Sequence, residues 1–206
     1  MGALDWFIEL NNKIKDIVMK PFNKKIALVV GHTPSGDRGA YSPHLEQSEF
    51  DFWIDVASKI KALGKSTKID VYDIFTHTEQ NYYNRQRSLS QKVNRGNYDY
   101  VVELHFNAAA PSANGTECLH YFNSKKGKEA AQKISQKIAK EYGTKLRGVE
   151  GAKALINKND RGYWFVYLPI APAVILEPFF GSNEESLKFQ DKDKLAKVLH
   201  EAFTSL

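Results

Sequence analysis

Short apolar runs alternate along the chain with longer segments whose apolar residues recur at helical spacing. Strands that alternate with helices in this way are typical of an α/β fold. The pattern predicts a single domain with a mostly parallel, twisted sheet of about six strands and helices on both faces. The predicted strands are 24–31, 68–75, 98–106, 115–122 and 172–180, and the predicted helices are 50–64, 85–96, 125–143 and 191–203.

Three segments need a separate interpretation. Residues 1–23 carry apolar residues near helical spacing, and we expect an amphipathic helical extension that docks on the 24–206 domain or contacts a membrane or partner. The segment 115–122 alternates polar and apolar residues, which predicts a strand at the sheet edge. The segment 143–168 is long enough to act as a lid, and its sequence RGYW at 161–164 predicts a loop.

Composition places the chain among ordinary globular proteins. Of its 206 residues 42% are hydrophobic and 26% charged, which excludes disorder and collagen. A single cysteine, Cys118, excludes a disulfide scaffold and fits a reducing compartment. The net charge of +5 favours an anionic partner such as a cell-wall polymer or membrane surface. We expect no nucleic-acid partner, because the sequence has neither zinc-finger spacing nor a basic helix with interleaved aromatic residues.

Ionisable side chains lie at the ends of three of the most apolar strands. His32 follows the first run, Glu103 and His105 end the run at 98–106, and Glu177 lies in the last run. Open α/β folds bind ligands outside the carboxyl ends of their strands, so we expect these side chains at one rim. Two histidines and one carboxylate, with a fourth position left for water, form a known type of catalytic zinc site.

The carboxylate ligand is expected at the start of the helix that follows His32. We favour Glu49, because residues at core spacing follow it, and Glu46 and His44 are the alternatives. Glu177 then stands outside the ligand set as the expected general base.

Four sequence elements together resemble those of zinc-dependent N-acetylmuramoyl-L-alanine amidases. They are GH followed by GDRGA within 31–40, SEF at 48–50, ELHFNA at 103–108 and AVILEPFFGSNEE at 173–185. The resemblance implies one Zn²⁺ on His32, Glu49 and His105, with Glu177 as the catalytic residue. It also implies peptidoglycan as substrate, cut between the lactyl group of N-acetylmuramic acid and L-alanine of the stem peptide.

Two positions depart from the pattern of that family. Threonine and proline at 33–34 stand where glycines are usual, so the path of this loop is expected to differ. Glu103 stands where a small or hydroxyl residue is usual, on the same strand face as His105. We expect Glu103 to pair with a lysine, and a hydrogen bond to the histidine is the alternative.

Several further residues have a predicted role. An aromatic and cationic set suits a saccharide or peptide ligand, and the candidates for substrate binding are Asn107, Arg161, Tyr163 and Trp164. Ser182 is the expected N-cap of a capping box that Glu185 completes. Cys118 and His120 share a strand face, and we expect a buried cysteine beside an ordinary histidine rather than a nucleophile or a metal site. We assign His77 and His200 to solvent.

Two other functions compete with amide hydrolysis in the wall. A zinc carboxypeptidase acting on wall peptides would need an arginine for the substrate carboxylate, and Arg161 is the candidate in a loop. A non-catalytic wall-binding module would not need a carboxylate such as Glu177 at a strand end. The sequence shows no signal peptide and no membrane span. We therefore expect a monomeric lysis enzyme, made in the cytoplasm and released to the wall through a holin-type pore, whose basic surface concentrates it there.

Overall fold

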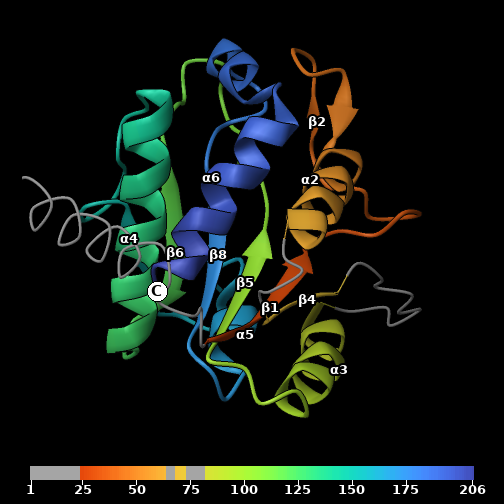
Figure 1. Ribbon diagram of the computed structural model, residues 1–206, viewed down its shortest axis with the longest axis vertical. Helices are drawn as coiled ribbons and strands as arrows, with labels where there is room; N and C mark the ends of the chain where they lie inside the picture. Colours follow the sequence, from red (N-terminus) through yellow and green to blue (C-terminus); the bar gives the residue numbers. More distant parts are fainter. Residues whose placement is uncertain (1–23, 64–67, 73–81) are drawn as a thin grey trace, which may run out of the picture.

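The centre of the molecule is a six-stranded sheet in the order β4-β1-β5-β8-β6-β7 (Figure 1). The computed structural model describes residues 24–63, 68–72 and 82–206. Neighbouring strands are parallel except β8 and β6, which are antiparallel. The α/β class and the mostly parallel sheet are therefore confirmed. The strands are β1 (Lys25–Val30), β4 (Lys68–Tyr72), β5 (Tyr100–Leu104), β6 (Glu117–Tyr121), β7 (Ala152–Leu155) and β8 (Ala173–Glu177), and a separate pair is formed by β2 (Tyr41–Ser42) and β3 (Gln47–Ser48).

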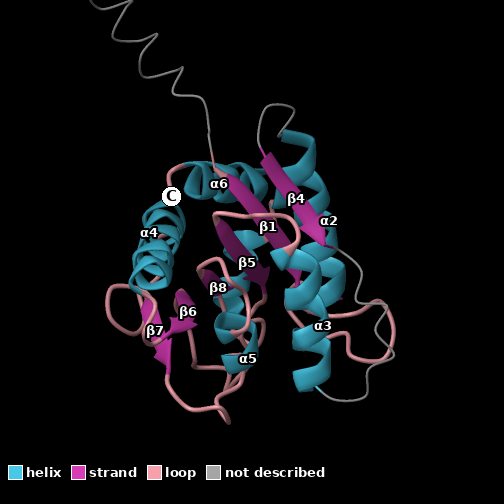
Figure 2. Cartoon of the chain, turned by 90° about the horizontal axis from the view of Figure 1, so that it is seen from below, coloured by secondary structure: helices cyan, strands magenta, loops and turns pink. Residues whose placement is uncertain are grey.

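Helices cover both faces of this sheet, as predicted. On one face α2, α4 and α6 share a core with alternate residues of the strands, and on the other face α3 and α5 do so. Figure 2 shows α5 on the opposite side of the sheet from α4 and α6. The helices are α2 (Glu49–Leu63), α3 (Tyr82–Asn94), α4 (Lys125–Tyr142), α5 (Tyr163–Tyr167) and α6 (Lys192–Thr204), with a 3₁₀ helix η1 (Glu184–Phe189) before the last.

Helix α4 illustrates how local sequence sets the ends of an element. Ser124 caps its first turn by accepting a hydrogen bond from the backbone N–H of Gly127. Gly143 ends the helix with φ of 63°, a left-handed conformation that glycine adopts without steric cost. The buried face between these caps includes Ile134 and Ile138, which pack on the sheet at helical spacing.

The prediction of an edge strand at 115–122 is wrong in its placement. This strand, β6, lies between β8 and β7, and its five residues are almost all buried. The edge belongs instead to β7, a four-residue strand inside the segment 143–168, which is long enough to act as a lid. Lys153 interrupts this strand of only four residues, so the sequence has no apolar run there that would predict a strand.

Two loop predictions also need correction. The residues after Arg161 begin α5, whose aromatic residues pack into the second core, so this part of 143–168 is fixed to the sheet rather than free to close. Asn183, not Ser182, caps the following 3₁₀ helix, because its side chain accepts from the N–H of Glu185. Ser182 instead accepts from the N–H of Ala109.

Some expectations fall on other parts of the chain. The proposed helical extension at 1–23 and His77 lie outside the described residues. His200 is half-buried, and its Nε2 has no hydrogen-bond partner among the described residues, so its assignment to solvent is wrong. Within the described ranges, no helix has the length and apolar character needed to cross a membrane.

Candidate metal centre and adjoining cavity

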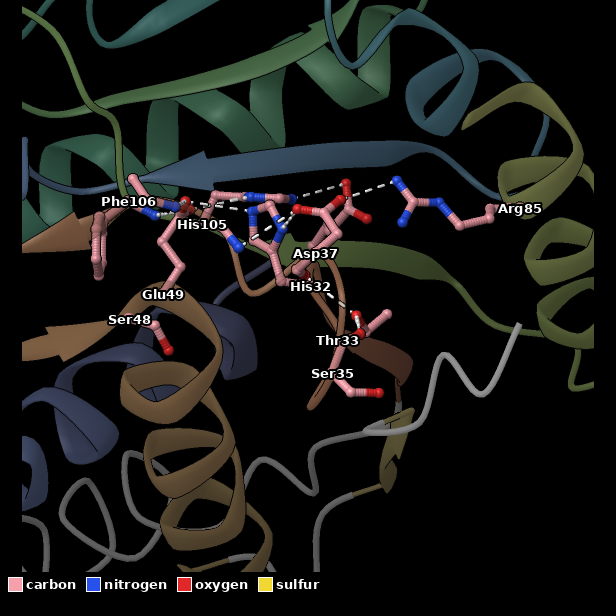
Figure 3. A network of polar contacts seen from close by, with 12 residues as sticks. His32, Thr33, Ser35, Asp37, Ser48, Glu49, Arg85, His105 and Phe106 are labelled. Atoms are coloured by element: carbon pink, nitrogen blue, oxygen red, sulfur yellow. Dashed lines mark hydrogen bonds and ion pairs between the residues drawn. The ribbon is translucent and has the colours of Figure 1, made fainter. Parts of the chain in front are cut away.

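His32 leaves the carboxyl end of β1 and is held by the loop that follows it. Its ring is 4% exposed, and its Nδ1 lies 3.1 Å from Asp37 Oδ1 (Figure 3). Arg85 of α3 donates to the other oxygen of Asp37 at 3.0 Å. Burial raises the pKa of Asp37, but the charges of His32 and Arg85 outweigh burial and lower it. Asp37 is therefore a carboxylate that accepts from Nδ1–H and leaves Nε2 of His32 as a lone-pair donor.

Glu49 is the first residue of α2 and faces both histidines. Its Oε2 lies 3.2 Å from His32 Nε2 and accepts from the N–H of Ala40, and its Oε1 accepts from the N–H of Phe106 at 3.0 Å. Burial raises the pKa of Glu49, but the hydrogen bonds and charges of the two histidines lower it well below the usual range. The alternatives that the sequence left open, Glu46 and His44, are exposed and lie outside the cluster.

His105 follows β5 and completes the cluster. Its Nδ1 lies 3.2 Å from Glu49 Oε1, and its Nε2 lies 3.3 Å from Glu103 Oε2. Burial lowers the pKa of His105, but the negative charges of Glu103 and Glu49 outweigh burial and raise it to about 10. The expected pairing of Glu103 with a lysine is wrong, because its side chain turns along the strand face toward this histidine.

The donor set of His32, Glu49 and His105 fits a zinc ion. One ligand atom from each of the three residues lies within 4.8 Å of the other two. His32 Nε2 is buried without a hydrogen-bond partner among the described residues, and the oxygen nearest to it is a carboxylate acceptor. Two lone pairs that face each other are unfavourable unless a proton or a cation lies between them. Two nitrogens and one carboxylate oxygen form the protein part of a catalytic zinc site.

Glu177 ends β8, beside the strand that leads to His105. Burial raises its pKa, the charge of His105 lowers it, and the charges of Glu117 and Glu49 raise it again, so that the pKa reaches about 7. Its Oε2 is buried and makes no hydrogen bond to any described residue. A carboxyl group with this pKa exchanges protons at neutral pH, as general acid–base chemistry requires.

Glu117 is a carboxylate of this site that the sequence analysis missed. It stands directly opposite Glu177 in the antiparallel register of β6 and β8 and is 2% exposed. Asn107 donates to its Oε1 at 3.1 Å, and Arg147 Nε lies 3.3 Å from its Oε2. The signal was a glutamate in a strand otherwise rich in apolar residues, but a strand assigned to the sheet edge gave no reason to place Glu117 near the rim.

These carboxylates and His105 form part of the floor of a cavity of about 840 Å³. Register places His105, Glu177 and Glu117 in one row across three strands, and Glu103, Ile175, Leu119 and Lys153 in the next row. A cavity of this volume is large enough for a drug-sized ligand. Its wall includes Asn107, Arg161 and Trp164, three of the four residues predicted to bind substrate.

The fourth predicted contact, Tyr163, is not on the cavity wall. Its side chain is 5% exposed and packs against Tyr121 and Tyr167 in the second core. The sequence RGYW assigned to a loop could not show that the first aromatic residue of α5 turns inward. Cys118 is fully buried, and burial raises the pKa of its thiol to about 12, in line with the core position predicted for it.

Comparison with known proteins places this geometry in context. The family model described as N-acetylmuramoyl-L-alanine amidase matches residues 26–205. The N-acetylmuramoyl-L-alanine amidase LytC of Bacillus subtilis is 25% identical over 204 residues, which are 94% of this chain and 37% of that protein. The chain thus spans little more than a third of the length of this curated relative.

Two solved structures share the fold. The CwlD amidase of Clostridioides difficile, solved in complex with the GerS lipoprotein, is 19% identical with a TM-score of 0.69, and the match covers 89% of this chain and 98% of that one. The catalytic domain of CwlV, an N-acetylmuramoyl-L-alanine amidase from Bacillus (Paenibacillus) polymyxa var. colistinus, is 19% identical with a TM-score of 0.67, covering 88% and 97%. At this identity the two structures support the fold alone.

Proposed function

Because the chain belongs to the N-acetylmuramoyl-L-alanine amidase family, we propose that it hydrolyses the amide bond between the lactyl group of N-acetylmuramic acid and L-alanine in peptidoglycan. The observation that carries this proposal is the cluster of His32, Glu49 and His105 beside Glu177, on one side of a large cavity. We assign the catalytic domain to residues 24–206, with one zinc ion as cofactor.

His32, Glu49 and His105 would hold the zinc ion. Zinc in such a site polarises the amide carbonyl and lowers the pKa of water toward about 7. Glu49 is fixed by backbone N–H donors from two loops, and Asp37 fixes the ring of His32, so the protein holds its donors in place before a metal arrives.

Glu177 acts as the proton carrier of the reaction. It accepts a proton from water as the water oxygen bonds to the carbonyl carbon, and it returns the proton to the nitrogen of L-alanine as the C–N bond breaks. Burial raises its pKa above the usual value for a carboxyl group, which favours proton transfer near neutral pH. Glu117, which pairs with Arg147 and accepts a hydrogen bond from Asn107, raises the pKa of Glu177 further from the opposite strand.

The cavity wall supplies groups for the substrate beyond the scissile bond. Trp164 offers an aromatic face to a sugar or peptide, and Lys153, Lys158 and Arg161 offer positive charge on the same wall. The stem peptide carries carboxylates that these cations attract. Four points stay predictions. They are wall binding by the basic surface, release through a holin-type pore, a role in wall lysis, and the monomeric state.

Digestion of purified sacculi tests the proposed reaction. The enzyme with zinc should release new amino groups on alanine, and a chelator should stop this release. His105→Ala should be inactive, whereas His44→Ala, which changes an exposed histidine outside the cluster, should retain wild-type activity. New reducing sugars in place of free alanine amino groups would contradict the proposal, because they come from glycosidic cleavage.

A zinc carboxypeptidase is the competing reaction for this site. It would release C-terminal amino acids from stem peptides, with Arg161 on the cavity wall as the group that holds the substrate carboxylate. Amino-acid analysis of the same digest separates the two reactions, since the amidase releases no free amino acid. A non-catalytic wall-binding module would leave the digest unchanged.

A further inference from the structure

Glu103 occupies an unusual place for a charged side chain. It lies within β5 and is 2% exposed, between Val29 of β1 and Ile175 of β8 in the sheet register. An aliphatic residue would continue this row at no electrostatic cost, whereas a carboxylate in such surroundings costs several kcal/mol unless it is paired. The contact that accounts for Glu103 must therefore be found in its immediate neighbourhood.

That contact is His105, two residues along the same strand face. Glu103 Oε2 lies 3.3 Å from Nε2 of the histidine, and Glu103 Oε1 has no hydrogen-bond partner among the described residues. No ion pair between Glu103 and a lysine or arginine is present in the described ranges. Glu103 therefore contacts His105 through a single ring atom, Nε2.

Both histidines of the cluster have a carboxylate near each of their two ring nitrogens. His32 presents Nε2 to Glu49 and has Asp37 at its other nitrogen, at 3.1 Å. His105 presents Nδ1 to Glu49 and has Glu103 at its other nitrogen, at 3.3 Å. Each ring therefore lies between Glu49, which contacts both histidines, and a second carboxylate that contacts only one of them.

We propose that Glu103 is a positioning residue, which accepts a hydrogen bond from Nε2–H of His105 and so directs the lone pair of Nδ1 toward the zinc site. A neutral imidazole has one N–H and one lone pair, and a carboxylate acceptor at Nε2 selects the tautomer that can bind metal through Nδ1. The same contact fixes the ring orientation. This inference rests on the proposed zinc site, but not on the identity of the bond that is cleaved.

The test measures zinc affinity and the tautomer separately from activity. Glu103→Met removes the acceptor with little change in volume, and Glu103→Gln keeps an oxygen that can accept from Nε2–H. Glu117→Gln removes another 2% exposed carboxylate of the cavity floor, one that pairs with Arg147 instead of a cluster histidine, and controls for loss of negative charge. Zinc dissociation constants come from chelator competition, and the tautomer from ¹⁵N chemical shifts of the His105 ring in zinc-loaded protein, where the ring is neutral and the shifts show which nitrogen binds the metal and which carries the proton.

Glu103→Met is expected to weaken zinc binding by about 10- to 100-fold and to lose the uniform Nε2–H tautomer. Glu103→Gln should lie between this variant and the wild type, and Glu117→Gln should change zinc affinity by less than about threefold, since it touches neither histidine. A Glu103→Met protein that keeps both the wild-type zinc affinity and the tautomer would overturn the proposal, as would an equal loss in Glu117→Gln. Wild-type protein that binds zinc but cleaves no wall amide would refute the proposed function alone.

Discussion

Replacement of Glu177 by glutamine separates the chemical step from metal binding and from folding. The variant keeps the size of the side chain and removes its ability to accept a proton. Glu177 is outside the His32–Glu49–His105 cluster, so zinc should remain bound. The amidase rate should fall by about 10²- to 10⁴-fold, the usual contribution of a general acid–base group.

The same substitution should stabilise the zinc-free protein. Burial raises the pKa of Glu177 from 4.5 to about 7, so the folded protein binds more protons than the unfolded chain between these values. Wild-type stability therefore decreases as pH rises through this window, by up to about 3 kcal/mol at pH 8 from a shift of this size. Glutamine carries no charge, so E177Q avoids this loss.

Urea unfolding of the chelated proteins at several values between pH 4.5 and 8 measures the stability effect. We expect E177Q to be more stable than the wild type at pH 8, with a difference that shrinks toward pH 4.5. Wild-type turnover should rise with pH as Glu177 ionises, and E177Q should lose this rise.

Three results would refute this reasoning. A stability difference that does not change with pH would mean that Glu177 has an ordinary pKa in the folded protein. Loss of zinc from E177Q would make Glu177 a metal ligand, and retention of more than a tenth of the wild-type rate would leave it no role as the general base.

Three other substitutions or treatments test separate parts of the site. Gly39→Ala should weaken zinc binding at least about tenfold, because the added Cβ would lie 2.6 Å from Glu49 Oε2. The control Gly36→Ala also changes a glycine with positive φ, but its Cβ would meet open space, so this variant should lose about 1–2 kcal/mol of stability and keep its zinc affinity. Equal zinc affinities of the two variants would contradict the role of Gly39 in leaving room for Glu49. Trp164→Ala should raise KM about fivefold with little change in kcat if its face contacts substrate, and an unchanged KM would remove it from the binding site. The thiol of Cys118 should resist alkylation in the folded protein, since burial raises its pKa to about 12, and fast labelling at pH 8 would show that β6 opens.

The site could be anticipated from sequence because a general rule links strand ends to ligands. The apolar runs before His32 and His105, and around Glu177, located three strands, and the rule for open α/β sheets gathered their ends. β1, β5 and β8 are indeed neighbours in the sheet. Core spacing behind Glu49 favoured it over Glu46 in the sequence, and the fold places Glu49 in the cluster and leaves Glu46 exposed outside it.

The less accurate predictions share a physical cause. The alternation of polar and apolar residues in β6 predicts an edge strand, because that pattern depends only on the local sequence. Its position inside the sheet depends on pairing with β8 on one side and β7 on the other, which are tertiary features. The short strand β7 and the aromatic α5 leave no periodic pattern long enough to detect. With the strand order unknown, neither Glu117 beside Glu177 nor the inward position of Tyr163 could be foreseen.

Hydrolysis of a soluble muramyl peptide in ¹⁸O-labelled water tests the central claim most directly. If the cavity beside His32, Glu49, His105 and Glu177 hydrolyses the lactyl–alanine amide, mass spectrometry will find one ¹⁸O in the lactyl carboxylate of N-acetylmuramic acid and none in the released peptide. Label in a peptide carboxylate, or an intact lactyl–alanine bond after incubation with the zinc-loaded enzyme, would contradict the account.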